Sequence, residues 1–571
     1  MELVEVRRLT GPNLLLDGPA GVLDVTCVDP AAVLAALRAR LVDHLEVLRA
    51  EDVAWRGVDG SDAARAWHGD SGLTWAVTAP VDLLYAMCAV LEAVWDDVVA
   101  GVPPGAPVVA SATQAALQET IDERDPALLE LLAAADEHGV AGVWDDDEVS
   151  VGLGRGSLTW DRADVPDPDE VPWDEVHDVP VAMVTGTNGK STTVRMLAGI
   201  LREAGMSPGN SSTDGIVVDG ELVEAGDWSG PGGGRTVGRD RRVGAMALET
   251  ARGGLLRRGL PLERADVAVV TNVAADHLGE YGIETVDDLA QAKLVVSKAV
   301  RSDGVLVLNA EDERLVAAAP DQPTTWFAVD PTAPALVSAM GAGGTTWTLE
   351  DGALTRRGPG GTAAVLRADD IPATFGGVAA HNVANALAAA AAATALGVSD
   401  ADIAAGLRAF VPDADTNPGR ANTYDLDGVT VVVDFAHNVH AVRAMAGLAR
   451  ALGGERTCVL FSQAGDRPDD ALEDLAAAVH ATGPDRYVVA EVPKYLRGRE
   501  PMEVPRRLAA ALHARGVPQD AVTEASDAVV GTEQALAWAR PGDVLLLLTL
   551  QHRAEVDELL RSRGATVTVP Q

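Results

Sequence analysis

The sequence predicts an α/β protein with a central, parallel, doubly wound sheet. A small α+β domain precedes this part, and a Rossmann-like α/β domain follows it. From about residue 178 onward, short and continuous apolar runs alternate with amphipathic helical patterns, which is typical of strands buried on both faces of a parallel sheet. The first 160 residues instead combine two strand-like stretches with long helical patterns.

Length and composition further limit the number of domains and the kinds of partner that this protein can have. The chain has 571 residues, enough for roughly three or four domains of about 150 residues each. Apolar residues make up 47%, so a sizeable core can be buried. The net charge of −40 argues against nucleic acid or an anionic membrane as the main partner, because both require basic surfaces. Only four of the 45 basic residues are lysines, so each lysine marks a position where arginine was not used.

Three features place the protein in a reducing compartment, and we expect it to be cytoplasmic. Three scattered cysteines are too few for a disulfide framework or a cysteine-based zinc site. The first residues do not form a signal peptide. The densest apolar run, which begins at Ala386, is alanine-rich and predicts a buried helix, not a membrane span.

The first predicted domain covers residues 1–165. Strand-like stretches open it at 1–9 and 21–28, and apolar residues recur at helical spacing over 31–50 and 81–100. Residues 161–180 are rich in proline and acidic residues, which is typical of a linker. The glycine-rich GLGRGS at 152–157 lies outside any strand–loop–helix unit and predicts a turn.

Two further domains are predicted, at 178–411 and 412–571. The first of them begins with a buried strand at 179–187 and an amphipathic helix at 191–205, and residues 327–375 suggest a β-hairpin insertion. A second break falls at 411–420. Buried strands are expected elsewhere in both domains, at 244–250, 266–273, 303–309, 428–438, 455–465, 485–493 and 543–550.

The strongest chemical signal is VTGTNGKST at 184–192, between a buried strand and a helix. Glycines allow a backbone to approach phosphate, and successive N–H groups at a helix N-terminus supply positive potential. Lys190 is expected to reach the β- and γ-phosphates of a nucleotide, and the Ser191 hydroxyl to bind Mg²⁺. A purely structural glycine turn is the alternative. The predicted nucleotide-binding residues here are Gly186, Thr187, Asn188, Gly189, Lys190, Ser191 and Thr192.

The loop departs from the general GxxxxGK[ST] pattern, because Val184 replaces the first glycine. The form GTNGK[ST]T resembles the phosphate loop of the Mur ligases, and ETARGGLLRRGL from Glu249 and TNVAADHLG from Thr271 are similar to that family's next two blocks. The stretches STDGIVVDGELVEAGDWSGP and YLRGREPMEVP resemble the Mur-like half of the cyanophycin synthetases, and RRLTGPNLLL near the start resembles the opening of those enzymes. Those enzymes also carry an ATP-grasp domain, for which this chain has too few residues before the linker.

The resemblance implies a set of metal and catalytic residues. Glu249 and His277, together with Ser191, would bind two Mg²⁺ ions. Asn272 would be a polar support for the site. The resemblance also implies that Lys293 is carbamylated by CO₂, which would convert a cation into an oxygen ligand. The alternatives are a helix-capping role for Glu249, a structural role for His277 and an ordinary surface position for Lys293. Lys298 fits a surface position better.

Further residues match the family's nucleotide-binding motifs. Asn382 and Asn385 match the HNxxN helix near the adenine, although two asparagines could merely cap a helix. Arg420, Asp434 and His437 resemble the C-terminal contributions to ATP binding. Two loop motifs at strand ends, AGDR at 464–467 and LRGRE at 496–500, are candidates for the acceptor side or are simply structural, and Lys494 beside the second is a weaker candidate.

Together these motifs predict an ATP-dependent carboxylate–amine ligase that works through an acyl phosphate. The resemblance implies amino-acid or peptide-like small molecules as substrates, with ATP and Mg²⁺ as cofactors. A nucleotide-binding regulatory or scaffolding subunit beside a separate ATP-grasp ligase, or a plain P-loop ATPase, are the alternatives. No nucleic-acid or membrane partner is expected, and the sequence leaves open whether the chain forms a homo-oligomer.

Overall fold

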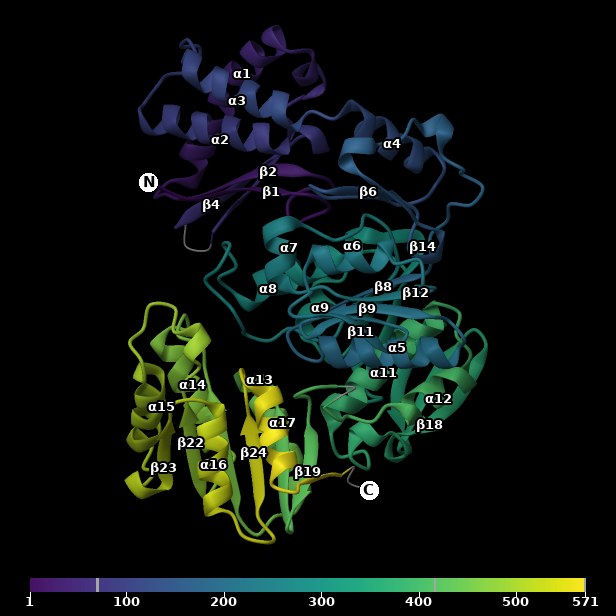
Figure 1. Cartoon of the computed structure of the whole chain (residues 1–571), viewed down its shortest axis with the longest axis vertical. Coiled ribbons are helices and arrows are strands. Elements are labelled where there is room, and N and C mark those ends of the chain that lie inside the picture. The colour runs from purple at the N-terminus through teal and green to yellow at the C-terminus, as the bar shows by residue number, and fades with distance from the viewer. Residues whose placement is uncertain (68–70, 415–416, 569–571) are drawn as a thin grey trace. The chain divides into compact units, whose positions relative to one another are not determined.

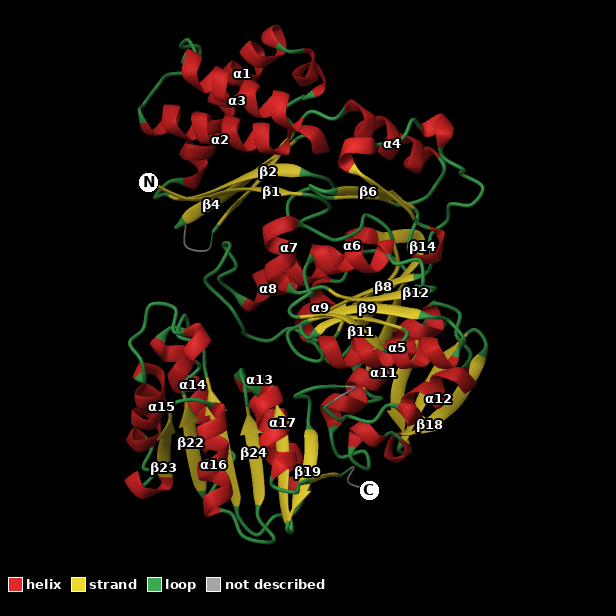
Figure 2. Cartoon of the chain, in the orientation of Figure 1, coloured by secondary structure: helices red, strands yellow, loops and turns green. Residues whose placement is uncertain are grey.

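The computed structural model describes residues 1–67, 71–414 and 417–568, and it confirms the predicted α/β class (Figures 1 and 2). Two residues of the expected break at 411–420, positions 415 and 416, lie outside the described residues. The chain forms two compact units. The first comprises Met1–Val273, Leu278–Trp326 and Ala391–Val398, and the second Ala274–His277, Phe327–Ala390 and Ser399–Gln571.

The first unit begins with an antiparallel sheet in the order β1-β2-β4-β3, with helices packed over one face (Figure 2). Helix α1 starts where expected, because Pro30 occupies its first turn and the Asp29 side chain accepts a hydrogen bond from the Ala32 N–H at 3.0 Å. The core between sheet and helices includes the fully buried Trp55 and Trp75. The elements are β1 (Glu2–Leu9), β2 (Ala20–Thr26), α1 (Pro30–Glu51), β3 (Asp62–Ala66), β4 (Gly72–Thr78), α2 (Leu84–Val99) and α3 (Ala110–Glu123).

A helix and a small antiparallel sheet follow, which the sequence patterns did not predict: α4 (Pro126–Glu137), β5 (Gly142–Trp144), β6 (Glu148–Val151) and β7 (Leu158–Asp161). The expected turn at 152–157 is confirmed as a short 3-10 turn. The expected linker at 161–180 is not a free spacer. Val171 and Val176 are buried in the core of the preceding sheet and helices, and the Trp173 ring stacks on His138 with centroids 4.3 Å apart.

The central part of the first unit is built on parallel strands in the order β9-β12-β8-β13-β14, extended by the antiparallel β10 and β11 at one edge. Helices lie on both faces of this sheet (Figure 1). The strands are β8 (Val181–Thr185), β9 (Pro208–Ser212), β10 (Gly215–Val218), β11 (Glu221–Ala225), β12 (Ala245–Glu249), β13 (Ala265–Val270) and β14 (Val300–Asn309). The helices are α5 (Lys190–Glu203), α6 (Pro231–Arg239), α7 (Arg252–Arg258), α8 (Val286–Leu294) and α9 (Glu313–Ala318).

The region predicted as a β-hairpin insertion is larger than expected. It contains α10 (Pro334–Gly341) and an antiparallel run of β16 (Thr346–Glu350), β17 (Ala353–Gly358) and β18 (Gly361–Arg367), and β15 (Thr324–Ala328) overlaps its start. The alanine-rich run forms the buried helix α11 (Ala380–Ala395), which is followed by α12 (Asp400–Ala409). Within the described residues, no helix has the length and apolar character needed to cross a membrane.

The second unit ends in a doubly wound sheet in the order β23-β22-β21-β24-β20-β19-β25, whose central strands are parallel. Separate apolar clusters pack α13, α14 and α15 on one face and α16 and α17 on the other. The strands are β19 (Asn422–Leu426), β20 (Val429–Asp434), β21 (Thr457–Ser462), β22 (Arg486–Ala490), β23 (Val522–Ala525), β24 (Val544–Leu548) and β25 (Thr566–Val567). The helices are α13 (Val439–Ala451), α14 (Asp469–His480), α15 (Glu503–Ala514), α16 (Ala528–Trp538) and α17 (Arg553–Ser562).

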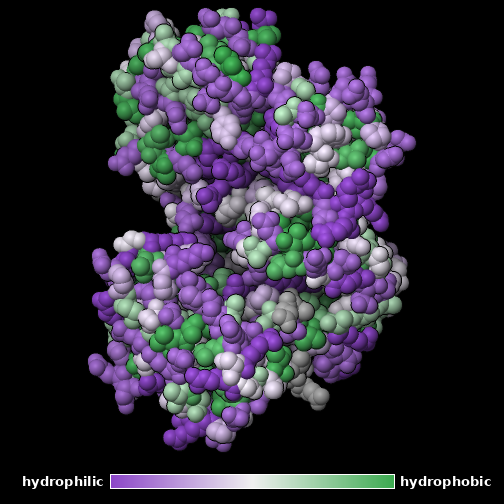
Figure 3. All heavy atoms as spheres, in the orientation of Figure 1, coloured by the Kyte–Doolittle hydropathy of each residue, from purple (hydrophilic) through white to green (hydrophobic). Residues whose placement is uncertain are grey.

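The surface agrees with the composition. Figure 3 shows hydrophilic side chains over most of the visible face, broken by small hydrophobic groups. An excess of acidic over basic residues, 85 against 45, favours a well-hydrated surface of this kind.

Candidate functional site

The predicted phosphate loop follows β8, at the carboxyl edge of the central sheet. This edge also carries Glu249, the last residue of β12, and Thr271, which follows β13. The register places Glu249 opposite Val184 and Val270 opposite Thr185, so the three strand ends lie level with one another. Ligands of open α/β sheets bind at such an edge, next to a point where the strand order reverses.

Two glycines shape the loop. Gly186 has φ 151°, and a Cβ placed there would lie 1.8 Å from Thr271 Oγ1, so no other residue fits. Gly189 has φ 87° and forms the N-cap of α5, which starts at Lys190. The loop therefore leads directly into the N-terminus of a helix, where backbone N–H groups can bind phosphate.

The loop is held in place by the segment after β13. Asn272 Oδ1 accepts from the Asn188 N–H at 3.0 Å, and Asn272 Nδ2 donates to the Asn188 carbonyl at 2.9 Å. The Thr271 hydroxyl donates to the same carbonyl at 2.7 Å. Asn272 thus occupies the supporting position expected for it. These bonds preorganise the loop before any ligand binds.

Lys190 lies at the first position of α5, and its Nζ donates to the Thr187 carbonyl at 3.1 Å. Thr192, in the same first turn, is buried. The Lys190 side chain therefore folds back over its own loop. A phosphate held by the N–H groups of that loop would lie beside the positive charge of this side chain.

Oxygen donors from three separate segments converge beside Lys190. The Ser191 hydroxyl donates to Glu249 Oε2 at 2.7 Å, and the Thr213 hydroxyl donates to Glu249 Oε1 at 3.1 Å. Glu249 is 3% exposed, so its carboxylate is turned inward from the end of β12. A carboxylate and two hydroxyls form the hard oxygen donor set that Mg²⁺ prefers, so these residues fit a magnesium site. Sequence reasoning assigned no role to Thr213, although it lies in the STDG stretch that resembles the family.

We expect Thr213→Val to raise the Mg²⁺ concentration for half-maximal ATP turnover about tenfold. The valine keeps the shape of threonine but removes a hydroxyl bound to a buried carboxylate, a bond worth about 1.5–3 kcal/mol. Titrating Mg²⁺ at saturating ATP measures the effect. Thr236→Val is the matched control, because that half-buried threonine of α6 donates to the Gly232 carbonyl of its own helix and not to a carboxylate. An equal Mg²⁺ requirement in the two variants would contradict this assignment.

Lys293 lies in the last turn of α8 and is 4% exposed, which excludes the surface position considered for it. The helix begins at a capping box, in which the Thr285 hydroxyl accepts from the Asp288 N–H and the Asp288 carboxylate accepts from the Thr285 N–H. Lys298 is not featureless either. Its ammonium pairs with the largely exposed Asp17 carboxylate at 2.9 Å.

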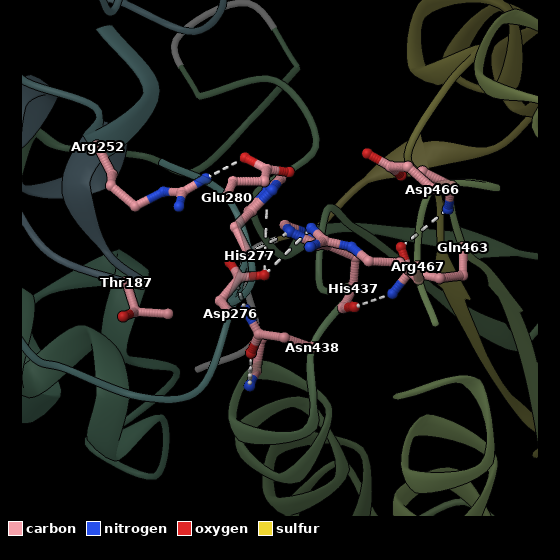
Figure 4. A network of polar contacts seen from close by, with 12 residues as sticks. Thr187, Arg252, Asp276, His277, Glu280, His437, Asn438, Gln463, Asp466 and Arg467 are labelled. Atoms are coloured by element: carbon pink, nitrogen blue, oxygen red, sulfur yellow. Dashed lines mark hydrogen bonds and ion pairs between the residues drawn. The ribbon is translucent and has the colours of Figure 1, made fainter. Parts of the chain in front are cut away.

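His277 belongs to a polar cluster of the second unit (Figure 4). Its Nε2 lies 4.0 Å from the Asp276 carboxylate, whose other oxygen is 3.8 Å from His437 Nε2. Among the described residues, Asp276, His277 and His437 form the one group of three or more histidine, cysteine, aspartate or glutamate side chains close enough together to hold a metal ion. Burial alone would raise the pKa of Asp276, but His437, His277 and Arg467 hold it far below its usual range.

His437 is oriented by the backbone. Its Nδ1 donates to the Phe435 carbonyl at 2.9 Å, which directs Nε2 toward Asp276. The Gln463 side chain donates to the His437 carbonyl at 2.8 Å, and Arg467 Nη2 approaches Asp276 Oδ1 at 3.3 Å. The AGDR loop thus reaches the same carboxylate as the histidines.

The asparagines of α11 are buried, and their side chains contact each other. Asn385 Nδ2 donates to Asn382 Oδ1 at 3.1 Å, while Asn382 Nδ2 donates to the Ala373 carbonyl at 2.7 Å. The Asn382 amide therefore donates to a loop outside the helix.

Asp434 ends β20 with its carboxylate buried, accepting from the N–H groups of Ala421 and Ala436 at 2.8 and 2.7 Å. Burial raises the pKa of Asp434, and Arg420 opposes the shift. Two guanidinium groups lie over the Phe435 ring, those of Arg420 at 4.5 Å and Arg553 at 4.8 Å from its centroid. Sequence reasoning missed Arg553. Its position after the last parallel strand, β24, was the available signal.

The two acceptor-side candidate loops form one structure. The Gly465 N–H donates to the Tyr495 carbonyl at 2.8 Å, and Arg499 donates to the carbonyls of Gly465 and Arg467 at 2.8 and 2.6 Å. Arg497 pairs with Asp466 across the same seam. Lys494 lies beside them, with its ammonium 5.6 Å from the centroid of the Tyr495 ring.

Comparison with known proteins agrees with this geometry. Residues 184–393 match the Mur ligase middle domain, and residues 419–549 match the Mur ligase glutamate ligase domain. The chain is 30% identical over 430 residues to the UDP-N-acetylmuramoylalanine–D-glutamate ligase of Streptomyces coelicolor, covering 73% of this chain and 76% of that enzyme. This chain belongs to the Mur ligase family. The resemblance found in the sequence motifs is thereby confirmed.

Within the Mur ligase family, the chain is also similar to cyanophycin synthetases. It is 39% identical over 326 residues to that of Trichormus variabilis, which is 56% of this chain and 36% of the relative. The match thus spans about a third of those longer proteins. Among solved structures, Escherichia coli FolC in complex with DHPP and ADP aligns with a TM-score of 0.50 at 22% identity, over 67% of this chain and 89% of FolC. That likeness supports the Mur ligase fold.

Proposed function

We propose that this Mur ligase family member is an ATP-dependent carboxylate–amine ligase that joins an amino acid to an amino-acid or peptide-like carboxylate. The observation that carries the proposal is the oxygen cluster of Ser191, Thr213 and Glu249 beside Lys190 and a preorganised phosphate loop. The relative at 30% identity is named a UDP-N-acetylmuramoylalanine–D-glutamate ligase, and the one at 39% identity a cyanophycin synthetase. We propose ATP and two Mg²⁺ ions as cofactors, and three domains at 1–165, 178–411 and 412–571.

The reaction has two chemical steps. A substrate carboxylate oxygen attacks the γ-phosphorus of ATP, and ADP leaves. The amine nitrogen of the second substrate then attacks the acyl carbon of the acyl phosphate. Phosphate leaves with the former carboxylate oxygen, and the nitrogen loses a proton to give the amide. Catalysis of such a transfer depends mainly on positioning and on neutralising charge.

The residues of the phosphate loop supply both the positioning and the charge neutralisation that the transfer requires. The N–H groups at the start of α5 bind phosphate oxygens, and the Lys190 ammonium offsets negative charge that accumulates on the transferring group. Asn272 and Thr271 keep the loop in this shape. Ser191, Thr213 and Glu249 would hold Mg²⁺, which supplies further charge neutralisation when bound. His277 is proposed as a ligand of the second ion, and a carbamylated Lys293 as an additional oxygen donor.

The nucleotide contacts of the second unit are proposed from the family motifs. Asn382 and Asn385 would face the adenine, and Arg420, Asp434 and His437 would contact the rest of ATP. The joined loops at 464–467 and 496–500 are proposed to contact the amine substrate. The cytoplasmic location expected from the sequence stays a prediction.

The test is a screen for acceptor-dependent ADP release. The full chain is incubated with Mg²⁺ and ATP against pairs of amino acids and short peptides, and products are detected by mass spectrometry. We expect one class of pairs to stimulate ADP release and to yield a product whose mass is the sum of both substrates minus water. ATP turnover that no acceptor changes would identify a plain ATPase, and nucleotide binding without turnover would identify a regulatory subunit. Either result contradicts the proposal.

A further inference from the structure

The segment between His277 and α8 adopts an unusual backbone. Residues 280–283 form a tight turn in which the Ile283 N–H donates to the Glu280 carbonyl at 3.1 Å. Both central residues have positive φ, 55° for Tyr281 and 67° for Gly282. This is the conformation of a type I′ turn, and a tyrosine adopts it only where surrounding contacts enforce it. His277, just before the turn, also has a positive φ of 51°.

The N-terminal sheet supplies one set of these contacts. Arg65 of β3 donates from Nη1 to the Gly282 carbonyl at 2.8 Å and pairs with the Asp288 carboxylate of α8. Its side chain is 17% exposed and that of Asp288 is 18% exposed, so the ion pair is shielded from solvent. One guanidinium thus holds both the turn and the N-terminal end of α8.

Aromatic packing adds to the contacts that fix the turn. The Trp67 ring lies so close to Gly282 that a Cβ at this position would be 2.5 Å from Trp67 Cδ1. The Trp67 indole is itself fixed by a hydrogen bond to Thr74 of β4 at 2.9 Å. The Arg7 guanidinium of β1 lies over the Tyr281 ring, 5.2 Å from its centroid. The turn is therefore contacted by side chains of β1 and β3 and of Trp67, which directly follows β3.

The central part of the first unit holds the turn from another side. Arg252, at the start of α7, pairs with Glu280 (Figure 4). Its side chain is 8% exposed. Because Arg252 lies three residues after Glu249, the turn is linked both to the candidate metal site and to the N-terminal sheet.

We propose that the N-terminal domain positions the active-site segment, with Arg65 as its principal positioning residue. The held turn lies between two candidate functional side chains: His277 is three residues before Glu280, and Lys293 is five residues after Asp288. Fixing the turn and the start of α8 therefore constrains the segment that connects His277 to Lys293. This inference rests on the proposed function for the roles of His277 and Lys293, and it assigns the N-terminal domain a part in the reaction.

The test uses Arg65→Ala, with Arg38→Ala as the matched control. Arg38 also pairs with a carboxylate of the same sheet, that of Asp62 in β3, and this bond lies away from the turn residues 280–283 in sequence and partner. Hydrogen–deuterium exchange of the full chain is measured by mass spectrometry on peptides covering 278–289. We expect exchange there to be at least tenfold faster in Arg65→Ala and unchanged in Arg38→Ala. Equal exchange in the two variants would overturn the proposal.

A second variant approaches the same contact from the turn. Gly282→Ala places a methyl group against Trp67 and penalises the positive φ, so it should release the segment while every arginine remains. Arg65→Lys keeps a charge for Asp288 but lacks the fork that reaches both partners, so it should show intermediate exchange. This mild variant keeps the test decisive if Arg65→Ala does not fold.

Kinetics separate positioning from a merely structural role. In Arg65→Ala we expect kcat to fall about tenfold and the Mg²⁺ concentration for half-maximal turnover to rise, while KM for ATP stays constant. A uniform loss with an unchanged Mg²⁺ requirement would overturn the positioning role. Hydrogen–deuterium exchange requires no substrate. If the wild-type protein shows no ligation, the proposed function is refuted, but the exchange measurement still decides whether Arg65 holds the segment.

Discussion

Replacing Lys190 with alanine is expected to reduce ATP turnover roughly 10²–10³-fold, the loss typical of removing one group that stabilises charge in a transition state. The ammonium lies at the start of α5, and its recorded bond is to the Thr187 carbonyl of its own loop. The fold should therefore survive the substitution, and the melting temperature should change little. Lys190→Arg is expected to fail as well, because a planar guanidinium cannot replace a compact ammonium within the loop.

Steady-state ADP release at saturating ATP measures this effect. Lys298→Ala is the matched control. It removes a lysine from the same unit whose partner, Asp17, is 90% exposed, and such ion pairs contribute little. Turnover by Lys190→Ala at the wild-type rate would show that the loop does not bind the transferring phosphate.

The second large effect is expected at Lys293. Its side chain is buried at the end of α8, and a buried ammonium is costly unless it is compensated or neutralised. Reaction of the neutral amine with CO₂ would give a carbamate, an anionic oxygen donor suited to Mg²⁺. We expect Lys293→Ala to lose ligation by roughly 10²–10³-fold, with no recovery in added bicarbonate.

Carbon-13 NMR distinguishes the carbamate from other roles of this lysine. Protein equilibrated with ¹³C-bicarbonate should show a carbamate signal that disappears in Lys293→Ala. If Lys293→Ala is inactive but the wild-type protein shows no carbamate signal, carbamylation is refuted and a role for the amine itself remains. Activity of Lys293→Ala at the wild-type rate would refute both.

The phosphate loop could be predicted because its determinants are local. A buried strand, glycines with positive φ at 186 and 189, and a helix beginning at Lys190 all lie within ten residues. Most buried strands of the two doubly wound sheets were predictable for the same reason, since continuous apolar runs report burial on both faces. Strand β9, PGNSS, was missed because it is fully buried without any apolar run.

Helix α6 could not be predicted from local signals. Its sequence, PGGGRTVGR, has glycines that disfavour a helix. The structure explains them by close packing. A Cβ at Gly233 would lie 2.1 Å from the Trp228 carbonyl oxygen, and one at Gly234 would lie 2.7 Å from Pro261. Tertiary contacts therefore override the local preference. The edge strand β11 was missed for another reason, because it is exposed along its whole length and shows no alternating pattern.

Partners distant in sequence were also beyond prediction. Thr213 and Glu249 are 36 residues apart, and Arg65 meets Gly282 across 217 residues. Each residue has an ordinary local context, and only the order of strands in the sheets brings them together. Sequence motifs thus indicated residues of the loop and of the candidate metal site, but not the N-terminal side chains that hold the turn after His277.

Oxygen-isotope transfer tests the central claim most directly. Once a substrate pair is found, the carboxylate substrate is labelled with ¹⁸O and the released phosphate is analysed by mass spectrometry. An acyl phosphate carries one carboxylate oxygen to phosphorus, so each turnover should place one ¹⁸O atom in phosphate and leave the other in the amide product. Unlabelled phosphate, formed at the same rate as the amide, would contradict the account.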